Sequence, residues 1–109
     1  MVEMSKIEAF VRRLVDEYEP EKVILFGSYA YGDPRDGSDV DLLVVMNTSD
    51  PPAMKAVEML RSLRPRFSID LIVRTPEQVV QRLAWDDFFL QDIFEKGKVL
   101  HESAHVRVD

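Results

Sequence analysis

The segment 27–41 contains a Gly-Ser pair that is followed, after ten residues, by an Asp-x-Asp motif, and an apolar strand-like run lies on each side. Gly27 lets the backbone approach a triphosphate closely because glycine has no side chain. Ser28 offers a hydroxyl and a backbone N–H at the start of a helical turn, where anions are favoured. Asp39 and Asp41 are hard oxygen ligands, which Mg²⁺ binds together with substrate phosphate oxygens. The spacing therefore predicts nucleotidyl transfer.

Asp70 is a third carboxylate, placed inside an apolar strand pattern whose neighbours predict burial. Adjacent strands lie about 4.8 Å apart, so Asp70 can converge on Asp39 and Asp41 if its strand lies beside theirs. Three carboxylates can then hold two divalent metals for an in-line displacement at phosphorus, or Asp70 can take the proton from the attacking hydroxyl. A structural ion pair with Arg66 or Arg74 is the alternative role for Asp70.

The elements that must position these residues follow from apolar periodicity and from turn residues. We expect helices over 5–18, 51–64, 76–84 and 86–96, strands over 23–26, 39–46 and 67–74, a short last strand over 98–101, and one helical turn after Ser28. The order α-β-β-α-β-α-α predicts an α/β fold with a mixed β-sheet core flanked by helices. The length suits a single minimal domain, 1–109.

The ends of the first two strands must meet if Gly27 is to lie near Asp39, which requires these strands to run antiparallel. Residues alternate between the two faces of a strand, so Asp41 shares its face with Leu43 and Val45. The helix over 51–64 then acts as a right-handed crossover that places the third strand parallel to the second.

Capping residues predict where the helices begin. Ser5 with Glu8 forms one capping-box pattern, and Thr75 with Gln78 forms another. Asp50 is expected to cap the helix that opens with two prolines. The buried stripe expected of that helix consists of Ala53, Val57, Leu60 and Leu63 or Arg64.

Composition limits the classes of function. The chain has 109 residues, a net charge of −6 and no cysteine. The acidic balance argues against stable nonspecific nucleic-acid binding, which depends on Lys and Arg contacts to phosphate, and the lack of cysteine excludes disulfides and thiol catalysis. The pattern shows no signal-peptide core and no apolar run near the roughly 20 residues that span a bilayer. We therefore expect a cytoplasmic protein with no membrane association.

The motif Gly27-Ser28, ten residues, then Asp39-Val40-Asp41 resembles the signature of the DNA polymerase beta-like nucleotidyltransferase superfamily. Gly32 and Ser38 also fit it, and with Asp70 the match covers roughly 23–74. The short length resembles that of the minimal nucleotidyltransferases. Members of that group are commonly antitoxins, paired with a HEPN-domain ribonuclease toxin.

The resemblance implies Mg²⁺-dependent transfer of AMP from ATP to a protein hydroxyl, typically a tyrosine of the partner toxin. It implies nucleotide-binding roles for Gly27 and Ser28, and roles as metal ligands and catalysts for Asp39, Asp41 and Asp70. A hetero-oligomer with the toxin or a homo-oligomer is the expected assembly. The rival readings are a non-catalytic antitoxin that neutralises its partner by contact, and a transferase that modifies a small molecule or an RNA end.

Several aromatic residues in the motif and after it have two alternative roles each. Tyr29 and Tyr31 can stack on a base or pack the loop onto the body of the protein. The segment with Trp85, Phe88, Phe89 and Phe94 is expected to pack mostly into the core, with some of it left for a partner. His101 and His105 have no metal-ligand neighbours in the sequence and are expected in solvent.

Overall fold

The computed structural model describes residues 1–103, and the order of its elements is the predicted one. The helices are α1 (Met4–Tyr18), α2 (Ser28–Tyr31), α3 (Pro52–Leu63), α4 (Pro76–Ala84) and α5 (Phe88–Lys96). The strands are β1 (Lys22–Phe26), β2 (Val40–Val45), β3 (Ile69–Arg74) and β4 (Lys98–Glu102).

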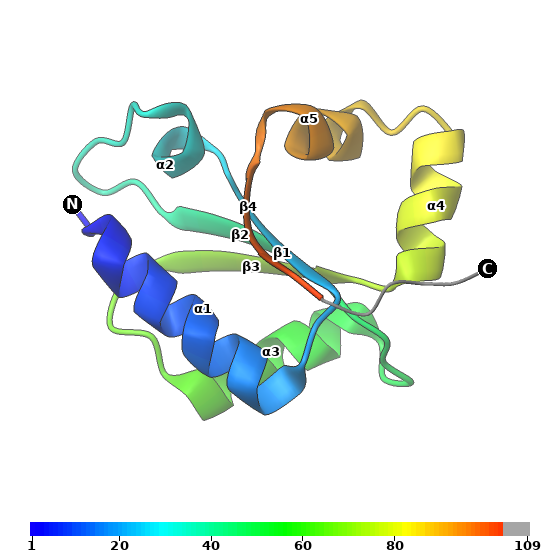
Figure 1. Ribbon diagram of the computed structural model, residues 1–109, viewed down its shortest axis with the longest axis horizontal. Helices are drawn as coiled ribbons and strands as arrows, with labels where there is room; N and C mark the ends of the chain where they lie inside the picture. Colours follow the sequence, from blue (N-terminus) through cyan, green and yellow to red (C-terminus); the bar gives the residue numbers. More distant parts are fainter. Residues whose placement is uncertain (104–109) are drawn as a thin grey trace.

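The four strands form one mixed sheet in the order β3-β2-β1-β4. β1 runs antiparallel to both β2 and β4, whereas β2 and β3 are parallel and are joined through α3. Both strand directions predicted from the motif are therefore confirmed. Figure 1 shows the consequence, which is that α2 lies at one end of the sheet, where β1 ends and β2 begins.

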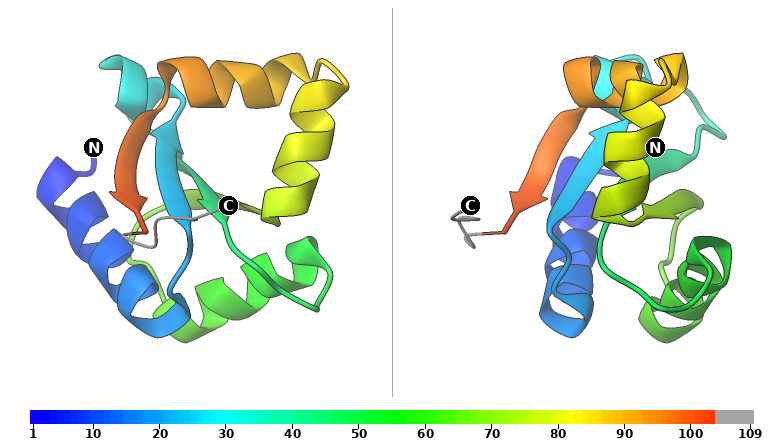
Figure 2. Two further views of the ribbon diagram at one scale, coloured as in Figure 1. Left: turned by 45° about the vertical axis from the view of Figure 1, so that its right-hand side comes forward. Right: turned by 90° about the vertical axis from the view of Figure 1, so that its right-hand side faces the viewer.

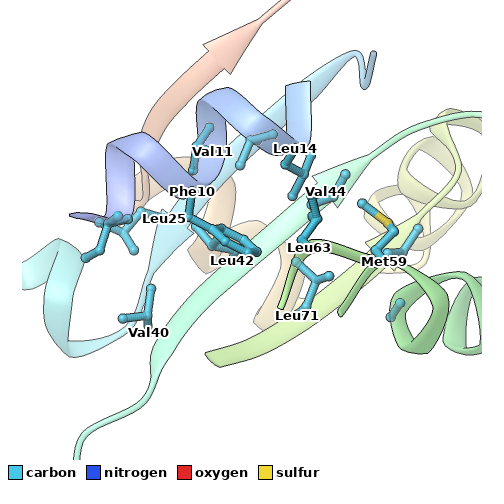
Figure 3. Close-up of a cluster of buried hydrophobic side chains, with 14 of the residues drawn as sticks. Phe10, Val11, Leu14, Leu25, Val40, Leu42, Val44, Met59, Leu63 and Leu71 are labelled. Atoms are coloured by element: carbon cyan, nitrogen blue, oxygen red, sulfur yellow. The ribbon is translucent and has the colours of Figure 1, made fainter. Parts of the chain in front are cut away.

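The helices cover the two faces of the sheet separately (Figure 1). α1 and α3 pack on one face around a large apolar cluster, part of which Figure 3 shows. α4 and α5 cover the other face with a smaller cluster that includes Val79, Leu90 and Ile93. Figure 2 shows these two helices meeting at a corner on that side. All buried residues described in 1–103 are apolar.

β2 divides its side chains between the two clusters. Val40, Leu42 and Val44 belong to the cluster under α1 and α3, and Leu43 and Val45 to the cluster under α4 and α5. Because successive residues alternate between faces, Asp41 lies on the α4–α5 face, in line with Leu43 and Val45. The sequence prediction for this strand is confirmed.

Two of the predicted caps are wrong. α1 begins one residue before Ser5 and has no side-chain cap, so Ser5 and Glu8 form no capping box. The N-cap of α3 is Pro51 rather than Asp50. Burial of an apolar face stabilises these helices without help from a cap. By contrast, the capping box of α4 is present, with Thr75 accepting from the backbone of Gln78.

The predicted buried stripe of α3 is also wrong in part. The buried residues are Ala56, Met59 and Leu63, whereas Ala53 and Val57 are exposed. Both sets follow helical spacing, so the pattern alone does not identify the inward face. The face with Ala56, Met59 and Leu63 packs into the cluster that α3 shares with α1.

The aromatic segment is more exposed than predicted. The exposed fraction is 71% for Trp85, 77% for Phe88 and 57% for Phe89, while Phe94 is half-buried. α5 begins at Phe88 with Asp87 as its cap, two residues later than expected. Leu90 and Ile93 therefore fill the core, which leaves these aromatic side chains at the corner between α4 and α5.

His101 is half-buried on β4 rather than in solvent, and His105 lies outside the described residues. Within residues 1–103, no helix has the length and apolar character needed to cross a membrane.

Candidate active site

Sheet pairing brings together residues that are distant in the sequence. Asp41 is the register partner of Phe26 on the antiparallel side and of Asp70 on the parallel side. Because paired residues in adjacent strands point to the same face, Asp41 and Asp70 stand side by side. Gly27 follows Phe26 directly, so the Gly-Ser pair lies at the same end of the sheet.

Gly27 packs against the carboxylate of Asp41. Its backbone has φ +73° and ψ −158°, a region that is essentially restricted to glycine. A Cβ at this position would lie 2.1 Å from Oδ2 of Asp41. Glycine is therefore required twice here, once by the backbone conformation and once by the neighbouring side chain.

Ser28 is the first residue of α2 and is half-buried. The backbone carbonyl of Gly27 accepts from the N–H groups of Ala30 and Tyr31 at 3.0 and 3.1 Å. This tight turn holds Ser28 immediately after Gly27, at the same end of the sheet as Asp41.

Asp39 lies just before β2 and is held by a residue that the sequence did not identify. The hydroxyl of Ser68 donates a hydrogen bond to Oδ1 of Asp39, and Ser68 lies just before β3. Ser68 and Asp70 are two residues apart, so they lie on the same face of the strand. This spacing was the signal in the sequence that could have identified Ser68. Ser68 is therefore a positioning residue, since it restrains a carboxylate of the site.

Asp70 is exposed, contrary to the burial that its apolar neighbours predicted. It lies near the open end of the sheet, where β3 is an edge strand. Within residues 1–103, Asp70 forms no ion pair with Arg66 or Arg74, and the guanidinium of Arg74 donates to the backbone of Val73 instead. The ion-pair alternative for Asp70 therefore has no support.

Electrostatic repulsion links the three carboxylates. Burial raises the pKa of Asp41 above its usual value, and the charges of Asp70 and then Asp39 raise this pKa further. All three influences act in the same direction, since each disfavours the ionised form. A divalent cation at this place would relieve the repulsion.

The donor set fits a hard divalent cation. Asp39, Asp41 and Asp70 supply only carboxylate oxygens, which are the ligands that Mg²⁺ prefers. In the described part of the chain, however, no three Asp, Glu, His or Cys side chains form a ready metal-binding group. Mg²⁺ usually keeps several waters and is bound through one or two carboxylates together with substrate phosphates, so the protein need not supply a complete set of ligands.

The raised pKa of Asp41 predicts a specific dependence of stability on pH. A carboxyl group with a raised pKa in the folded state stabilises the fold below its unfolded pKa of 3.8, and that contribution is lost as pH rises through the folded pKa. Without divalent cations, the free energy of unfolding of the wild type should therefore fall relative to that of Asp41→Asn over the pH range that begins near the unfolded pKa of 3.8 and extends upward. Chemical denaturation across this range measures the difference. Parallel curves would contradict the prediction.

The two tyrosines of α2 differ in their surroundings. Tyr29 packs against the cluster under α1, and its hydroxyl accepts from the backbone N–H of Val2 at 3.0 Å. Tyr31 is exposed, and its hydroxyl donates to Asp92 of α5 at 3.3 Å. The contacts of Tyr29 favour the packing role over base stacking.

The family that matches this chain agrees with the residues found at the site. The model of a family described as "Nucleotidyltransferase domain" matches residues 4–109. The chain therefore belongs to the nucleotidyltransferase domain family, within the DNA polymerase beta-like superfamily, and it is a nucleotidyltransferase. The family expected from the Gly-Ser and Asp-x-Asp motif is confirmed.

Relatives and solved structures agree with this assignment. "Putative protein adenylyltransferase MJ0604" of Methanocaldococcus jannaschii is 32% identical over 105 residues, which cover 93% of this chain and 100% of that protein. The crystal structure of a "putative nucleotidyltransferase" from Sulfolobus solfataricus matches with a TM-score of 0.56 and 25% identity, over 71% of this chain and 70% of that one. A toxin–antitoxin crystal structure with AMP-PNP matches in fold with a TM-score of 0.55 and 22% identity, over 89% of this chain and 74% of that one.

Proposed function

We propose that this protein transfers AMP from ATP to a protein hydroxyl in the presence of Mg²⁺. The observation that carries the proposal is the pairing of Asp41 with Asp70 across β2 and β3, with Gly27 packed on Asp41 and Ser28 beside it. This arrangement places a glycine backbone, a hydroxyl and the carboxylates of Asp41 and Asp70 at one end of the sheet. The adenylyltransferase name of the Methanocaldococcus jannaschii relative supports ATP as donor and a protein as acceptor.

In this reaction the oxygen of the acceptor hydroxyl forms a bond to the α-phosphorus of ATP, and the bond from that phosphorus to pyrophosphate breaks. Gly27 and Ser28 bind and orient the triphosphate through backbone and hydroxyl groups. Asp70 is exposed and accepts the proton of the attacking hydroxyl. Asp39 and Asp41 would hold Mg²⁺, which neutralises phosphate charge when it is bound.

The acceptor that we propose is a tyrosine of a HEPN-type ribonuclease toxin, with this chain as the antitoxin. The fold shared with a toxin–antitoxin structure that contains AMP-PNP supports both the nucleotide and the type of assembly. Modification of the toxin would then be the step that neutralises it.

A second candidate is neutralisation of a partner by contact alone. The exposed side chains of Trp85, Phe88 and Phe89 favour it, because soluble monomers rarely leave clustered large aromatic residues in water. A complex that forms and inhibits without any covalent change would support this candidate.

The function is tested by incubating the purified protein with ATP, Mg²⁺ and the protein encoded beside it, followed by intact-mass spectrometry. We expect the neighbouring protein to gain the mass of one AMP and to lose its ribonuclease activity. Omitting Mg²⁺ or replacing ATP by GTP provides controls for the metal and for the base. A stable complex without a gain in mass would instead establish the contact-only antitoxin.

A further inference from the structure

A groove of about 1180 Å³ lies between α1 and the connection from α3 to β3. Figure 1 shows this connection beside α1, at the end of the sheet where β2 and β3 begin. The charged side chains that line the groove are all basic, namely Lys6, Arg13, Arg64 and Arg66. Among the described residues, no Asp or Glu lines it, although the chain as a whole has 20 acidic and 14 basic residues. The groove is therefore a basic region in an acidic protein.

The basic side chains of the groove are not neutralised by the protein itself. Within residues 1–103, none of the four has a carboxylate within ion-pair distance. Lys22, Lys55, Arg82 and Lys96 form ion pairs elsewhere on the surface, whereas the groove gathers four unpaired cations around one hollow. Arg13 also donates to the backbone carbonyl of Leu63, which ties its guanidinium to the end of α3. The unpaired charges favour an anionic ligand over a neutral one.

The groove is continuous with the candidate active site. Ser68 lines the groove and donates to Asp39. Ser38 also lines it and directly precedes Asp39. The groove therefore borders the site at Ser68, which holds Asp39. Asp41 lies on the α4–α5 face, so a bound chain would reach the carboxylates around the starts of β2 and β3.

We propose that this basic groove binds an acidic segment of the acceptor protein and delivers the hydroxyl of that segment to Asp39 and Asp70. The inference rests on the proposed transfer of AMP to a protein. An acidic segment would otherwise be repelled by a protein with a net charge of −6 and by the charges of Asp39, Asp41 and Asp70. The four unpaired cations offset that repulsion along the groove.

The aromatic lining favours a protein segment over single-stranded RNA. RNA-binding grooves present exposed ring faces on which bases stack. Here, Phe67 packs edge-on against Phe10, with ring centroids 5.7 Å apart, and both rings belong to the core beneath the groove. The groove thus combines positive charge with apolar surface but lacks a stacking platform formed by these rings.

The test uses two fluorescein-labelled peptides of equal length, each with one tyrosine, flanked by glutamates in one and by lysines in the other. The test variant combines Lys6→Glu with Arg66→Glu. The matched control combines Arg12→Glu with Arg61→Glu, because these exposed residues lie on α1 and α3 outside the groove lining and change the net charge equally. Fluorescence anisotropy measures the dissociation constant, and mass spectrometry measures AMP transfer to the peptide.

We expect the wild type to prefer the glutamate peptide. The groove variant should raise the dissociation constant about tenfold, and the control should change it by less than about twofold. In transfer, KM for the peptide should rise while kcat stays unchanged. Equal weakening in both variants, preference for the lysine peptide, or tighter groove-dependent binding of a single-stranded RNA probe would each overturn the proposal.

The failure of docking and the failure of transfer give different results. Groove-dependent binding of the glutamate peptide, with no AMP on it or on the neighbouring protein, would leave docking in place and reject the proposed function. AMP transfer that is insensitive to the groove variant would reject docking and leave the proposed function in place.

Discussion

Asp41→Asn is expected to lower AMP transfer at least about 10²–10³-fold while the protein remains folded. Asp41 is the register partner of Asp70 in the neighbouring strand, and its carboxylate is close enough to Gly27 to exclude a Cβ there. Asp41 therefore lies at the centre of the proposed site. Asparagine keeps the shape and removes the charge that Mg²⁺ needs. Initial rates with labelled ATP and the neighbouring protein measure the effect, and circular dichroism verifies the fold.

The same substitution should not destabilise the protein at neutral pH. Asp41 is partly buried, and Asp70 and Asp39 repel its charge, so removing that charge removes an unfavourable interaction. Asp92→Asn provides a matched control, because Asp92 is a carboxylate on α5 that contacts Tyr31 and Lys96 outside the site. Transfer that persists in Asp41→Asn at the rate of this control would reject the assignment of Asp41.

Gly27→Ala is expected to impair both stability and transfer. The backbone conformation of Gly27 costs other residues on the order of 1–3 kcal/mol. The added methyl group would also meet Oδ2 of Asp41 at 2.1 Å, so the carboxylate must move. We expect the free energy of unfolding to fall by about 2 kcal/mol or more, and transfer to fall by about 10²-fold, as it does when a reacting group is misplaced by about 1 Å.

Gly32→Ala separates the effect of the backbone conformation from the effect of the contact with Asp41. Gly32 also has a positive φ, +82°, but an added Cβ there has no heavy atom within 4 Å. This variant should lose part of the stability and keep its rate of transfer. Equal losses of transfer in the two variants would mean that the contact between Gly27 and Asp41 does not matter to the reaction. Urea denaturation and initial-rate measurements on both proteins decide the matter.

Most of the sheet could be predicted because the relevant patterns are local. The alternation of β2 placed Asp41 with Leu43 and Val45, and the two faces are as expected. Gly27 and Asp39 had to meet, which fixed the antiparallel pairing of β1 and β2. The helix between β2 and β3 was expected to act as a crossover, and β3 is parallel to β2 as that expectation required.

The errors concern properties that depend on tertiary packing. Two stripes of α3 have helical spacing, and the stripe that is buried depends on how α3 packs against the sheet and α1. Asp70 reads as buried from its neighbours in sequence, but β3 is an edge strand, and position in a sheet is not visible in a local pattern. The hydrogen bond from Ser68 to Asp39 joins two strand starts and likewise depends on the parallel pairing.

The position of β3 at the edge of the sheet also affects the lifetime of the assembled site. Gly27, Ser28, Asp39 and Asp41 lie on the contiguous unit β1-α2-β2, whereas Asp70 arrives on a strand with only one neighbour. Edge elements open locally at lower free energy than the core does. Each such opening would carry Asp70 and Ser68 away from Asp41 and Asp39 without unfolding the rest. Amide exchange along β3, rather than global unfolding, would therefore report how often the proposed site comes apart.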